Sequence, residues 1–293
     1  MKLILALILG LATPVAAEPL ANQLFGAATT TSQQKPMPVG SYARGCGAGM
    51  VELPESGPTW QAMRLGRNRH YGQPVLVQYL VDLSGFATKV GWAGLYIGDM
   101  SQPRGGPMTS GHASHQIGLD ADIWMLPPKR VNLSASERES ISSVAIRSDD
   151  QKSVTANWTP AHVALMKAAA SDSRVDRIFI AAAAKIAMCK GATRKDKAWL
   201  QKIRPLYGHE THFHVRLKCP AGASLCETQT PTVAELSNNG DGCDDTLMYW
   251  VSDAYLHPPP PDPNAPKTPH VKTPREFTMA DLPNQCAAVL ASP

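Results

Sequence analysis

Two short stretches of the sequence gather side chains that can bind a metal ion or transfer protons. "SGHASHQIGLDADIWM", residues 110–125, and "HETHFHVRL", residues 209–217, contain five of the nine histidines and two neighbouring aspartates. These candidates are His112, His115, Asp120, Asp122, His209, His212 and His214. Imidazoles with one carboxylate suit zinc, and three such ligands with a fourth position open to water make a catalytic site. An isolated His-x-His or a surface His–Asp pair is usually only a hydrogen-bonding feature, but two separate clusters favour a metal site.

The second stretch alternates polar and apolar residues, which predicts a strand over "HFHVRLKC", residues 212–219. Side chains two positions apart lie on the same face of a strand, so His212 and His214 share one face. Phe213 and Val215 then face the core. Both imidazoles could bind one metal ion, or one could bind while the other acts as a base. Strand geometry alone leaves these alternatives open.

The first stretch combines a loop with a strand. "LDADIWM", residues 119–125, alternates in the same way and places Asp120 and Asp122 on one face. His112 and His115 lie in the preceding loop, where glycines allow the backbone to turn. A loop therefore supplies imidazoles and a strand supplies carboxylates to the same region.

The rest of the chain has signals for both helices and strands. Apolar residues at helical spacing predict a helix over residues 73–90, and a Thr-Pro start with an Ala-rich apolar face predicts another over residues 159–172. A strand is expected at residues 93–100, and a strand leading into a helix at residues 175–189. The connecting loops are long and rich in Gly and Pro. The prediction is an α+β fold in which a small antiparallel sheet is flanked by helices and long loops.

One catalytic domain is expected over residues 18–256. Its first part, residues 18–40, is small and polar and predicts an extended arm. Residues 257–293 form a tail that begins "HPPPPDPNAPKTPHVKTP", which is typical of polyproline II. Because Cys286 lies beyond this segment, we expect the tail to return to the body and to be linked there by a disulfide.

The N-terminus and the cysteines indicate an exported protein. "MKLILALILGLATPVAA", residues 1–17, has the charge, short apolar run and small residues of a signal peptide cleaved after Ala17, with a membrane anchor as the alternative. No later apolar run is long enough to span a membrane. Six cysteines predict three disulfides, and spacing alone favours only Cys219–Cys226. A formal net charge of +4 without a dense Lys/Arg run argues against nucleic-acid binding.

"GGPMTSGHASHQIGLDADIWM" and "HETHFHVRLKCP" resemble the two motifs of the penicillin-insensitive murein endopeptidases. These are periplasmic zinc enzymes of the clan that contains the lysostaphin-type and D-Ala-D-Ala peptidases. The clan's first motif is His, six residues, Asp, matched by His115 and Asp122, and its second is His-x-His, matched by His212 and His214. "RNRHYGQPVLVQYLVDLS", "GLYIGDM" and the C-terminal region also resemble the family, so the resemblance covers most of the chain after the signal.

The resemblance implies zinc bound by His115, Asp122 and His214. It makes His212 the general base and places His209 near the reacting carbonyl. It also implies three disulfides, which are Cys46–Cys286, Cys189–Cys243 and Cys219–Cys226.

Three further residues have less defined roles. Asp120 is a candidate to orient a ligand imidazole. His112 adjoins the ligand loop, either beside the ligands or as a weaker ligand to an additional ion. Family members can carry a further Asp/His metal pair near Asp149 at a subunit contact, but "SDDQKS" contains no His, which puts that site in doubt. The sequence does not decide between a monomer and a homodimer.

The function implied by the resemblance is hydrolysis of D-alanyl–meso-diaminopimelate cross-links in peptidoglycan. Zinc-activated water would attack, and His212 would accept the proton. One alternative is a D-Ala-D-Ala carboxypeptidase of the same clan, but those enzymes usually carry Glu where this chain has Thr211. Another is a periplasmic zinc- or wall-binding protein without catalysis. Serine catalysis fits poorly, because Ser110 and Ser114 lie in neither a G-x-S-x-G nor an S-x-x-K context.

Overall fold

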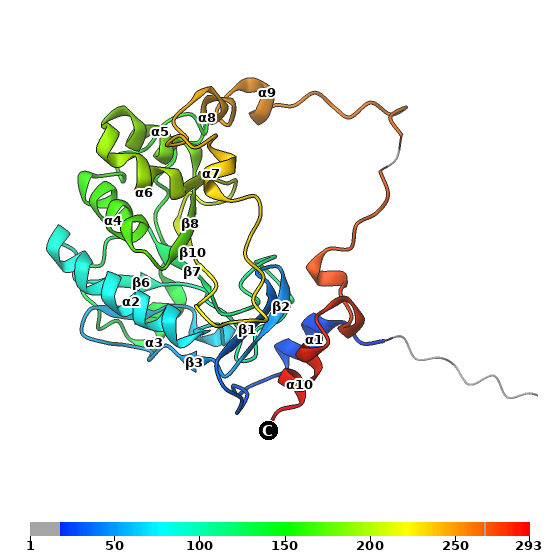
Figure 1. Cartoon of the computed structure of the whole chain (residues 1–293). Helices are drawn as coiled ribbons and strands as arrows, with labels where there is room; N and C mark the ends of the chain where they lie inside the picture. Colours follow the sequence, from blue (N-terminus) through cyan, green and yellow to red (C-terminus); the bar gives the residue numbers. More distant parts are fainter. Residues whose placement is uncertain (1–17, 267) are drawn as a thin grey trace, which may run out of the picture.

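The computed structural model describes residues 18–266 and 268–293, so the predicted signal peptide lies outside the described residues. Helices and strands alternate with long loops and form one body, an α+β fold as predicted (Figure 1). The described part of the chain has one six-stranded sheet, two two-stranded sheets and ten α-helices. Within those described ranges, no helix is both long and apolar enough to cross a membrane.

The six-stranded sheet brings the two predicted strands of the site together. Its strands lie in the order β4 (Trp60–Ala62), β6 (Leu95–Ile97), β7 (Asp120–Trp124), β10 (His212–Leu217), β8 (Val175–Ile180) and β9 (Ile203–Pro205). The four middle strands pair antiparallel, as expected, whereas the edge pairs β4–β6 and β8–β9 are parallel. The sheet is therefore mixed, with β7 and β10 adjacent at its centre.

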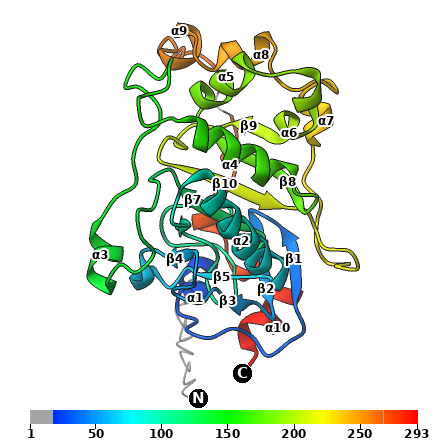
Figure 2. The same ribbon diagram turned by 90° about the vertical axis from the view of Figure 1, so that its left-hand side faces the viewer.

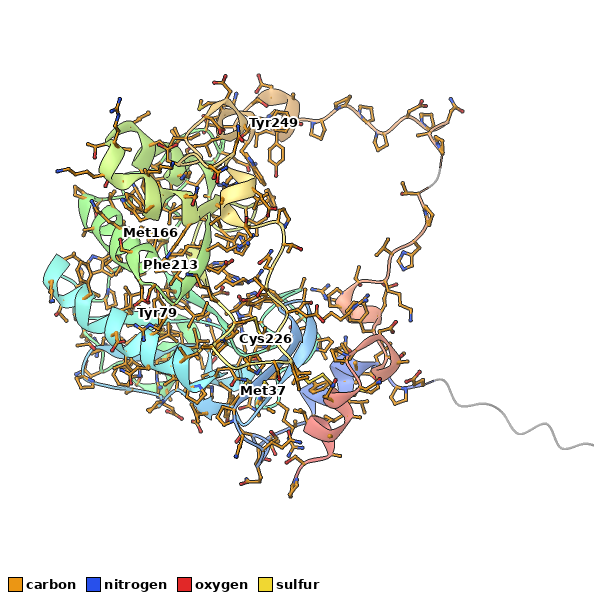
Figure 3. All side chains as sticks on the ribbon, viewed as in Figure 1. Met37, Tyr79, Met166, Phe213, Cys226 and Tyr249 are labelled. Atoms are coloured by element: carbon orange, nitrogen blue, oxygen red, sulfur yellow. A yellow bond between two sulfur atoms is a disulfide. The ribbon has the colours of Figure 1, made fainter. Side chains whose placement is uncertain are left out.

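Alternation divides β7 and β10 into an apolar and a polar face. Ala121, Ile123, Phe213 and Val215 are 0–1% exposed and belong to the main hydrophobic core. Residues of α2 (Pro74–Ala87) and α4 (Pro160–Ser171) complete this core, and both helices cover the sheet on the same side (Figure 2). Figure 3 shows Tyr79 of α2, Met166 of α4 and Phe213 of β10 in this layer. The opposite face of β7 and β10 is left for polar side chains.

Both covering helices begin where the sequence predicts. α2 has Pro74 at its first position, where a backbone N–H would have no helical partner. α4 starts after Thr159, whose backbone N–H donates to Nδ1 of His162 at 3.2 Å. The two helices contact each other above the sheet. Their apolar faces hold the site strands in place from behind.

The remaining elements are short. The other helices are α1 (Ala21–Gly26), α3 (Ala135–Ser140), α5 (Ala182–Lys190), α6 (Lys197–Lys202), α7 (Val233–Leu236), α8 (Asp245–Tyr249), α9 (Asp253–Leu256) and α10 (Gln285–Ala291). The small sheets are the pairs β1 (Met37–Ser41) with β2 (Arg44–Ala48) and β3 (Val51–Glu52) with β5 (Tyr71–Gly72). β8 and α5 together correspond to the predicted strand and helix over residues 175–189.

The N- and C-terminal segments lie together beside the β1–β2 pair (Figure 1). Ala21 and Phe25 of α1 pack with Cys46 and Phe277 in a second, smaller core. The expectation of an extended arm is therefore wrong for Ala21–Gly26, which form a helix. The physical reason is tertiary: the helix finds its apolar partner in the distant tail, and the local sequence does not show this.

Three disulfides link Cys46 with Cys286, Cys189 with Cys243 and Cys219 with Cys226, the pairs that the resemblance implies. The first joins the tail to β2. After α9 the chain runs outward and then returns to the body at α10 (Figure 1). Three disulfides are typical of proteins outside the reducing cytoplasm.

Candidate metal centre and active site

Antiparallel pairing of β7 with β10 places the two predicted clusters against each other. Asp122 lies opposite His214, and Asp120 lies opposite Arg216. Residues directly opposite in such a pair carry neighbouring side chains on the same face. Two motifs that are distant in the sequence therefore form one polar surface.

The loop between β6 and β7 delivers His112 and His115 to this surface. Gly111 and Gly118 have φ values of 78° and 75°, and His115 itself has φ 67°. A non-glycine residue in this left-handed region is strained and persists only where its surroundings hold it. The backbone N–H of His115 donates to Asp120 Oδ2 at 3.0 Å, and Ser101 Oγ donates to the carbonyl of His115 at 2.5 Å. The imidazole is thereby fixed beside Asp122.

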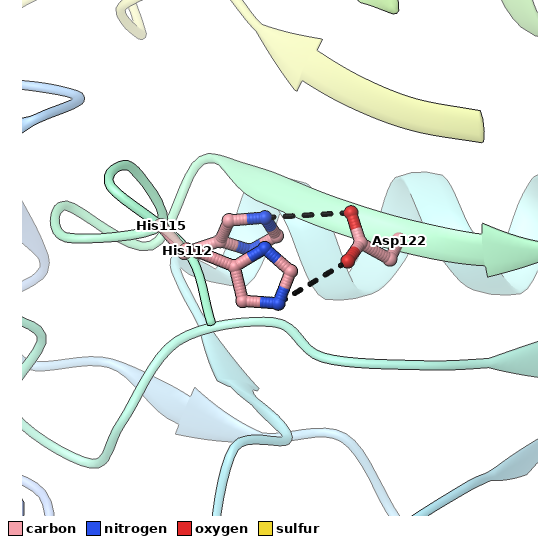
Figure 4. A group of neighbouring side chains, drawn as sticks. All are labelled: His112, His115 and Asp122. Atoms are coloured by element: carbon pink, nitrogen blue, oxygen red, sulfur yellow. Dashed lines mark ion pairs between the residues drawn. The ribbon is translucent and has the colours of Figure 1, made fainter. Parts of the chain in front are cut away.

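His112, His115 and Asp122 form a group in which each residue offers one possible ligand atom, and these three atoms lie within 4.8 Å of one another (Figure 4). The two imidazoles face different oxygens of the carboxylate. His115 Nε2 lies 3.4 Å from Asp122 Oδ1, and His112 Nε2 lies 3.4 Å from Oδ2. From the neighbouring strand, His214 Nδ1 also lies 3.4 Å from Asp122 Oδ1. Asp122 is therefore the common centre of three imidazoles.

Several buried polar atoms in this cluster have no hydrogen bond. Among the described residues, both ring nitrogens of His115 and Oδ1 of Asp122 are buried without a partner. An unpaired buried polar group costs roughly 1–3 kcal/mol, and more if it is charged. A cation between His115 Nε2 and Asp122 Oδ1, which lie 3.4 Å apart, would engage one lone pair of each. The donor set therefore fits a metal ion.

Asp120 fixes the orientation of His214. Its Oδ1 accepts from His214 Nε2 at 2.9 Å and from Arg216 Nε at 2.7 Å, and its Oδ2 accepts from Arg216 Nη2 at 3.2 Å. With its proton on Nε2, His214 turns the lone pair of Nδ1 toward Asp122. Carboxylates commonly orient metal-binding imidazoles in this way.

His212 and His209 lie beside the cluster. His212 Nε2 is 3.6 Å from Asp122 Oδ2, and the ring centres of His212 and His209 are 4.9 Å apart. His209 Nδ1–H donates to the carbonyl of Tyr207 at 2.9 Å, which leaves its Nε2 available. His112, Asp122 and His212 line a cleft of about 350 Å³. A ligand in this cleft would contact the cluster directly.

Burial and neighbouring charges set the protonation states. Burial alone would raise the pKa of Asp122, but the charges of His212 and His115 outweigh it and hold this pKa well below its usual range. Burial lowers the pKa of His214 to about 3. Burial alone would lower the pKa of His115, but the carboxylates of Asp122, Asp120 and Asp99 together outweigh it and raise this pKa. An ionised Asp122 and a neutral His214 are the forms that bind metals, whereas His115 would release a proton on binding one.

The structure brings all seven predicted residues to one region. Four imidazoles lie against Asp122, and they belong to His112, His115, His212 and His214. Asp120 is hydrogen-bonded to His214, and the ring of His209 packs beside that of His214. The candidate metal-binding group lies in this region, and the described residues contain no similar group near Asp149.

Two residues of the site were not predicted from the sequence. Asp99 follows β6, and its Oδ2 accepts from His112 Nε2 at 3.0 Å and from Arg69 Nη1 at 3.1 Å. Burial alone would raise the pKa of Asp99, but His112 and nearby arginines lower it to about 2. Arg216 binds Asp120. A signal existed for both, because Arg216 continues the alternation of the His strand and Asp99 is the first charged residue after an apolar strand.

Comparison with known proteins identifies the family. A family model for penicillin-insensitive murein endopeptidases matches residues 38–291. The penicillin-insensitive murein endopeptidase of Haemophilus influenzae is 39% identical over 270 residues, which cover 92% of this chain and 90% of that protein. The proteins of that name from Klebsiella pneumoniae and Escherichia coli K12 are 39% and 38% identical over 252 residues, covering 86% of this chain and 85% of each relative. The chain therefore belongs to the penicillin-insensitive murein endopeptidase family and is a peptidase.

Proposed function

We propose that this peptidase uses zinc to hydrolyse D-alanyl–meso-diaminopimelate cross-links of peptidoglycan in the periplasm. Family membership supports peptide hydrolysis in murein, and it favours an endopeptidase over a D-Ala-D-Ala carboxypeptidase or a non-catalytic wall-binding protein. The three disulfides support an exported protein, in keeping with a cleaved signal over residues 1–17.

The observation that carries the proposal is the set of buried, unpaired atoms on His115 and Asp122. We assign zinc to His115, Asp122 and His214. In a tetrahedral site with zinc–ligand distances near 2.1 Å, two ligand atoms lie about 3.4 Å apart. His115 Nε2 and His214 Nδ1 each lie 3.4 Å from Asp122 Oδ1, which supports this set. His112 donates its Nε2–H to Asp99 instead, which supports a role outside the three ligands.

Zinc bound there would act as a Lewis acid that acidifies water and stabilises negative charge on the carbonyl oxygen. His212 lines the cleft beside Asp122, where it can accept a proton from the attacking water and then donate it to the leaving amine. His209 has a free Nε2 and supports charge on the reacting carbonyl. No serine is acylated in this chemistry, so β-lactams that acylate serine have no target.

Metal analysis and kinetics on two neighbouring histidines test these roles. His212→Ala should keep its zinc, while turnover falls by roughly two to four orders of magnitude, the usual contribution of a general base. The loss should lie mainly in kcat, because proton transfer helps only the transition state. His214→Ala should lose the metal. A metal-free His212→Ala beside a zinc-loaded His214→Ala would reverse the assignment.

The substrate is tested by mass spectrometry of purified cross-linked muropeptides. The wild-type protein should convert dimers to monomers, and a chelator should stop this conversion. Intact dimers after incubation with the zinc-loaded protein would refute the proposed reaction.

A further inference from the structure

The cleft beside the candidate metal centre has a wall that the proposed catalysis does not use. Arg64 and Arg67, from the segment between β4 and β5, line the same cleft as Asp122 and His212. Trp124, at the end of β7, lines the same cleft, and the Arg64 guanidinium lies 5.7 Å from its ring centre. A cleft that must admit a peptide thus carries two guanidinium groups next to its reacting centre.

Arg67 is the arginine that remains available to a ligand. Its side chain is 52% exposed, and its Nη1 donates to Asp99 Oδ2 at 3.0 Å. Within the described ranges, the rest of its guanidinium makes no hydrogen bond. Arg64 also donates once, from Nη2 to the carbonyl of Ile141 at 2.8 Å, but it is only partly exposed and its guanidinium lies over the Trp124 ring. A guanidinium held at one nitrogen can still offer a pair of N–H groups to a carboxylate.

Asp99 places Arg67 close to the metal cluster. Both Arg67 Nη1 and His112 Nε2 lie 3.0 Å from Asp99 Oδ2, so these nitrogens can be no farther apart than twice that distance. His112 Nε2 in turn lies 3.4 Å from Asp122 Oδ2. Taken together, these distances place Arg67 Nη1 within about 10 Å of Asp122 Oδ2, and both residues line the same cleft.

The turn that carries Arg67 is strained and firmly held. Arg64 and Asn68, which flank it, have φ values of 59° and 53°. The backbone N–H of Gly66, inside the turn, donates to Glu139 Oε1 of α3 at 2.8 Å. Strain that is held by neighbouring elements in this way marks functional segments. The position of Arg67 is fixed by the fold rather than left to a flexible loop.

We infer that Arg67 binds the free carboxylate of the diaminopimelate residue whose amine forms the scissile amide. In the cross-link, this carboxylate is attached to the same carbon as the amide nitrogen, so it enters the cleft together with the bond to be cut. A guanidinium recognises a carboxylate through paired, charge-assisted hydrogen bonds. This inference rests on the proposed function and assigns to Arg67 the preference for cross-links that carry an unmodified carboxylate.

The test compares two muropeptide dimers, one with this carboxylate free and one with it amidated. Wild-type kcat/KM should be roughly 10- to 100-fold higher on the free dimer, the range expected for a hydrogen bond to a charged group. Arg67→Gln should lose that factor on the free dimer, mainly through KM, and should cleave the amidated dimer as well as the wild type does. Arg67→Lys should recover part of the preference.

Arg130→Gln is the matched control. Arg130 is 51% exposed and pairs with one carboxylate, that of Glu137, but it does not line the cleft. Its replacement should leave the kinetics on both dimers unchanged. Zinc content should equal that of the wild type in all variants.

The possible outcomes distinguish a failure of this inference from a failure of the proposed function. A wild-type protein that cleaves neither dimer refutes the proposed function and the inference together. A wild type that cleaves both dimers equally well overturns the inference alone. The same holds if Arg67→Gln loses an equal factor on both dimers, or loses its zinc, because the role of Arg67 would then be structural.

Discussion

Two histidines of this chain are almost completely buried, yet their surroundings are opposite. His162 in α4 is 1% exposed, its Nε2–H donates to the carbonyl of Met125 at 2.9 Å, and its Nδ1 accepts from the backbone of Thr159 at 3.2 Å. His115 is 0% exposed, and neither of its ring nitrogens has a hydrogen-bond partner in the described part of the chain. One imidazole is satisfied by the protein, and the other is not.

The difference separates a structural histidine from a candidate ligand. Burial alone does not mark a metal site, because His162 is as deeply buried as His115. The backbone adds a second distinction: His162 lies in an ordinary helix, whereas His115 is strained and held by Asp120 and Ser101. The strained backbone of His115 presents an imidazole that has no hydrogen-bond partner among the described residues, and we expect the two histidines to respond oppositely to mutation.

The largest expected effect is on metal binding and turnover. His115→Ala should remove the bound zinc and lower turnover by roughly three orders of magnitude or more, because both the Lewis acid and the activated water depend on the metal. His162→Ala should keep both its zinc and its turnover. Elemental analysis and muropeptide kinetics on the two purified variants measure this. Equal metal loss in both variants would remove the distinction between them.

The second effect, on the stability of the metal-free protein, should run the other way. His162→Ala should lower the free energy of unfolding by about 2–4 kcal/mol, since it leaves a cavity and two unpaired backbone groups. His115→Ala should cost less, because it removes atoms that had no partner. Urea unfolding in the presence of a chelator compares the two variants. A larger loss for His115→Ala would contradict the assignment of its nitrogens as unsatisfied.

The same contrast explains which features of the site could be predicted from the sequence. Alternation in β7 and β10 was enough to predict which side chains share a face, because strand geometry is local. The pairing of Asp122 with His214 depends on register between distant strands, and only the resemblance indicated that the two clusters meet. Nothing local distinguishes His162 from a ligand before the carbonyl of Met125 is placed beside it.

Other features of the fold and the site could not be predicted either, because they also depend on contacts between distant parts of the chain. The helix α1 forms in a segment expected to be extended, because its apolar partner Phe277 comes from the other end of the chain. Asp99 was missed because its role depends on three cationic or imidazole groups that converge on it only in the fold. Parallel pairing at the sheet edges likewise depends on long connections rather than on local pattern.

A smaller effect should follow from changing the residue that holds both the backbone of His115 and the ring of His214. Asp120→Asn should weaken zinc affinity by roughly 10- to 100-fold, as is usual for residues that orient metal ligands. Asp253→Asn is the control, because Asp253 is 77% exposed in its side chain and pairs with Lys152 at the surface. Competition with a chelator of known affinity measures the change. Undiminished affinity in Asp120→Asn would show that His214 is positioned without it.

The smallest effect concerns the titration of His162. Burial lowers its pKa, and protonation of Nδ1 would break the hydrogen bond from Thr159. Below its ordinary pKa of about 6.5, the unfolded chain therefore takes up a proton that the folded protein resists, so stability should fall as the pH drops from neutrality, by at most about 1.4 kcal/mol per pH unit. His162→Gln does not titrate and can still accept from Thr159 at the helix start. The stability advantage of the wild type over this variant, measured by urea unfolding with chelator present, should thus be larger at pH 7.5 than at pH 5.5. A difference that stays constant across this range would mean that the folded protein protonates His162 as readily as the unfolded chain does.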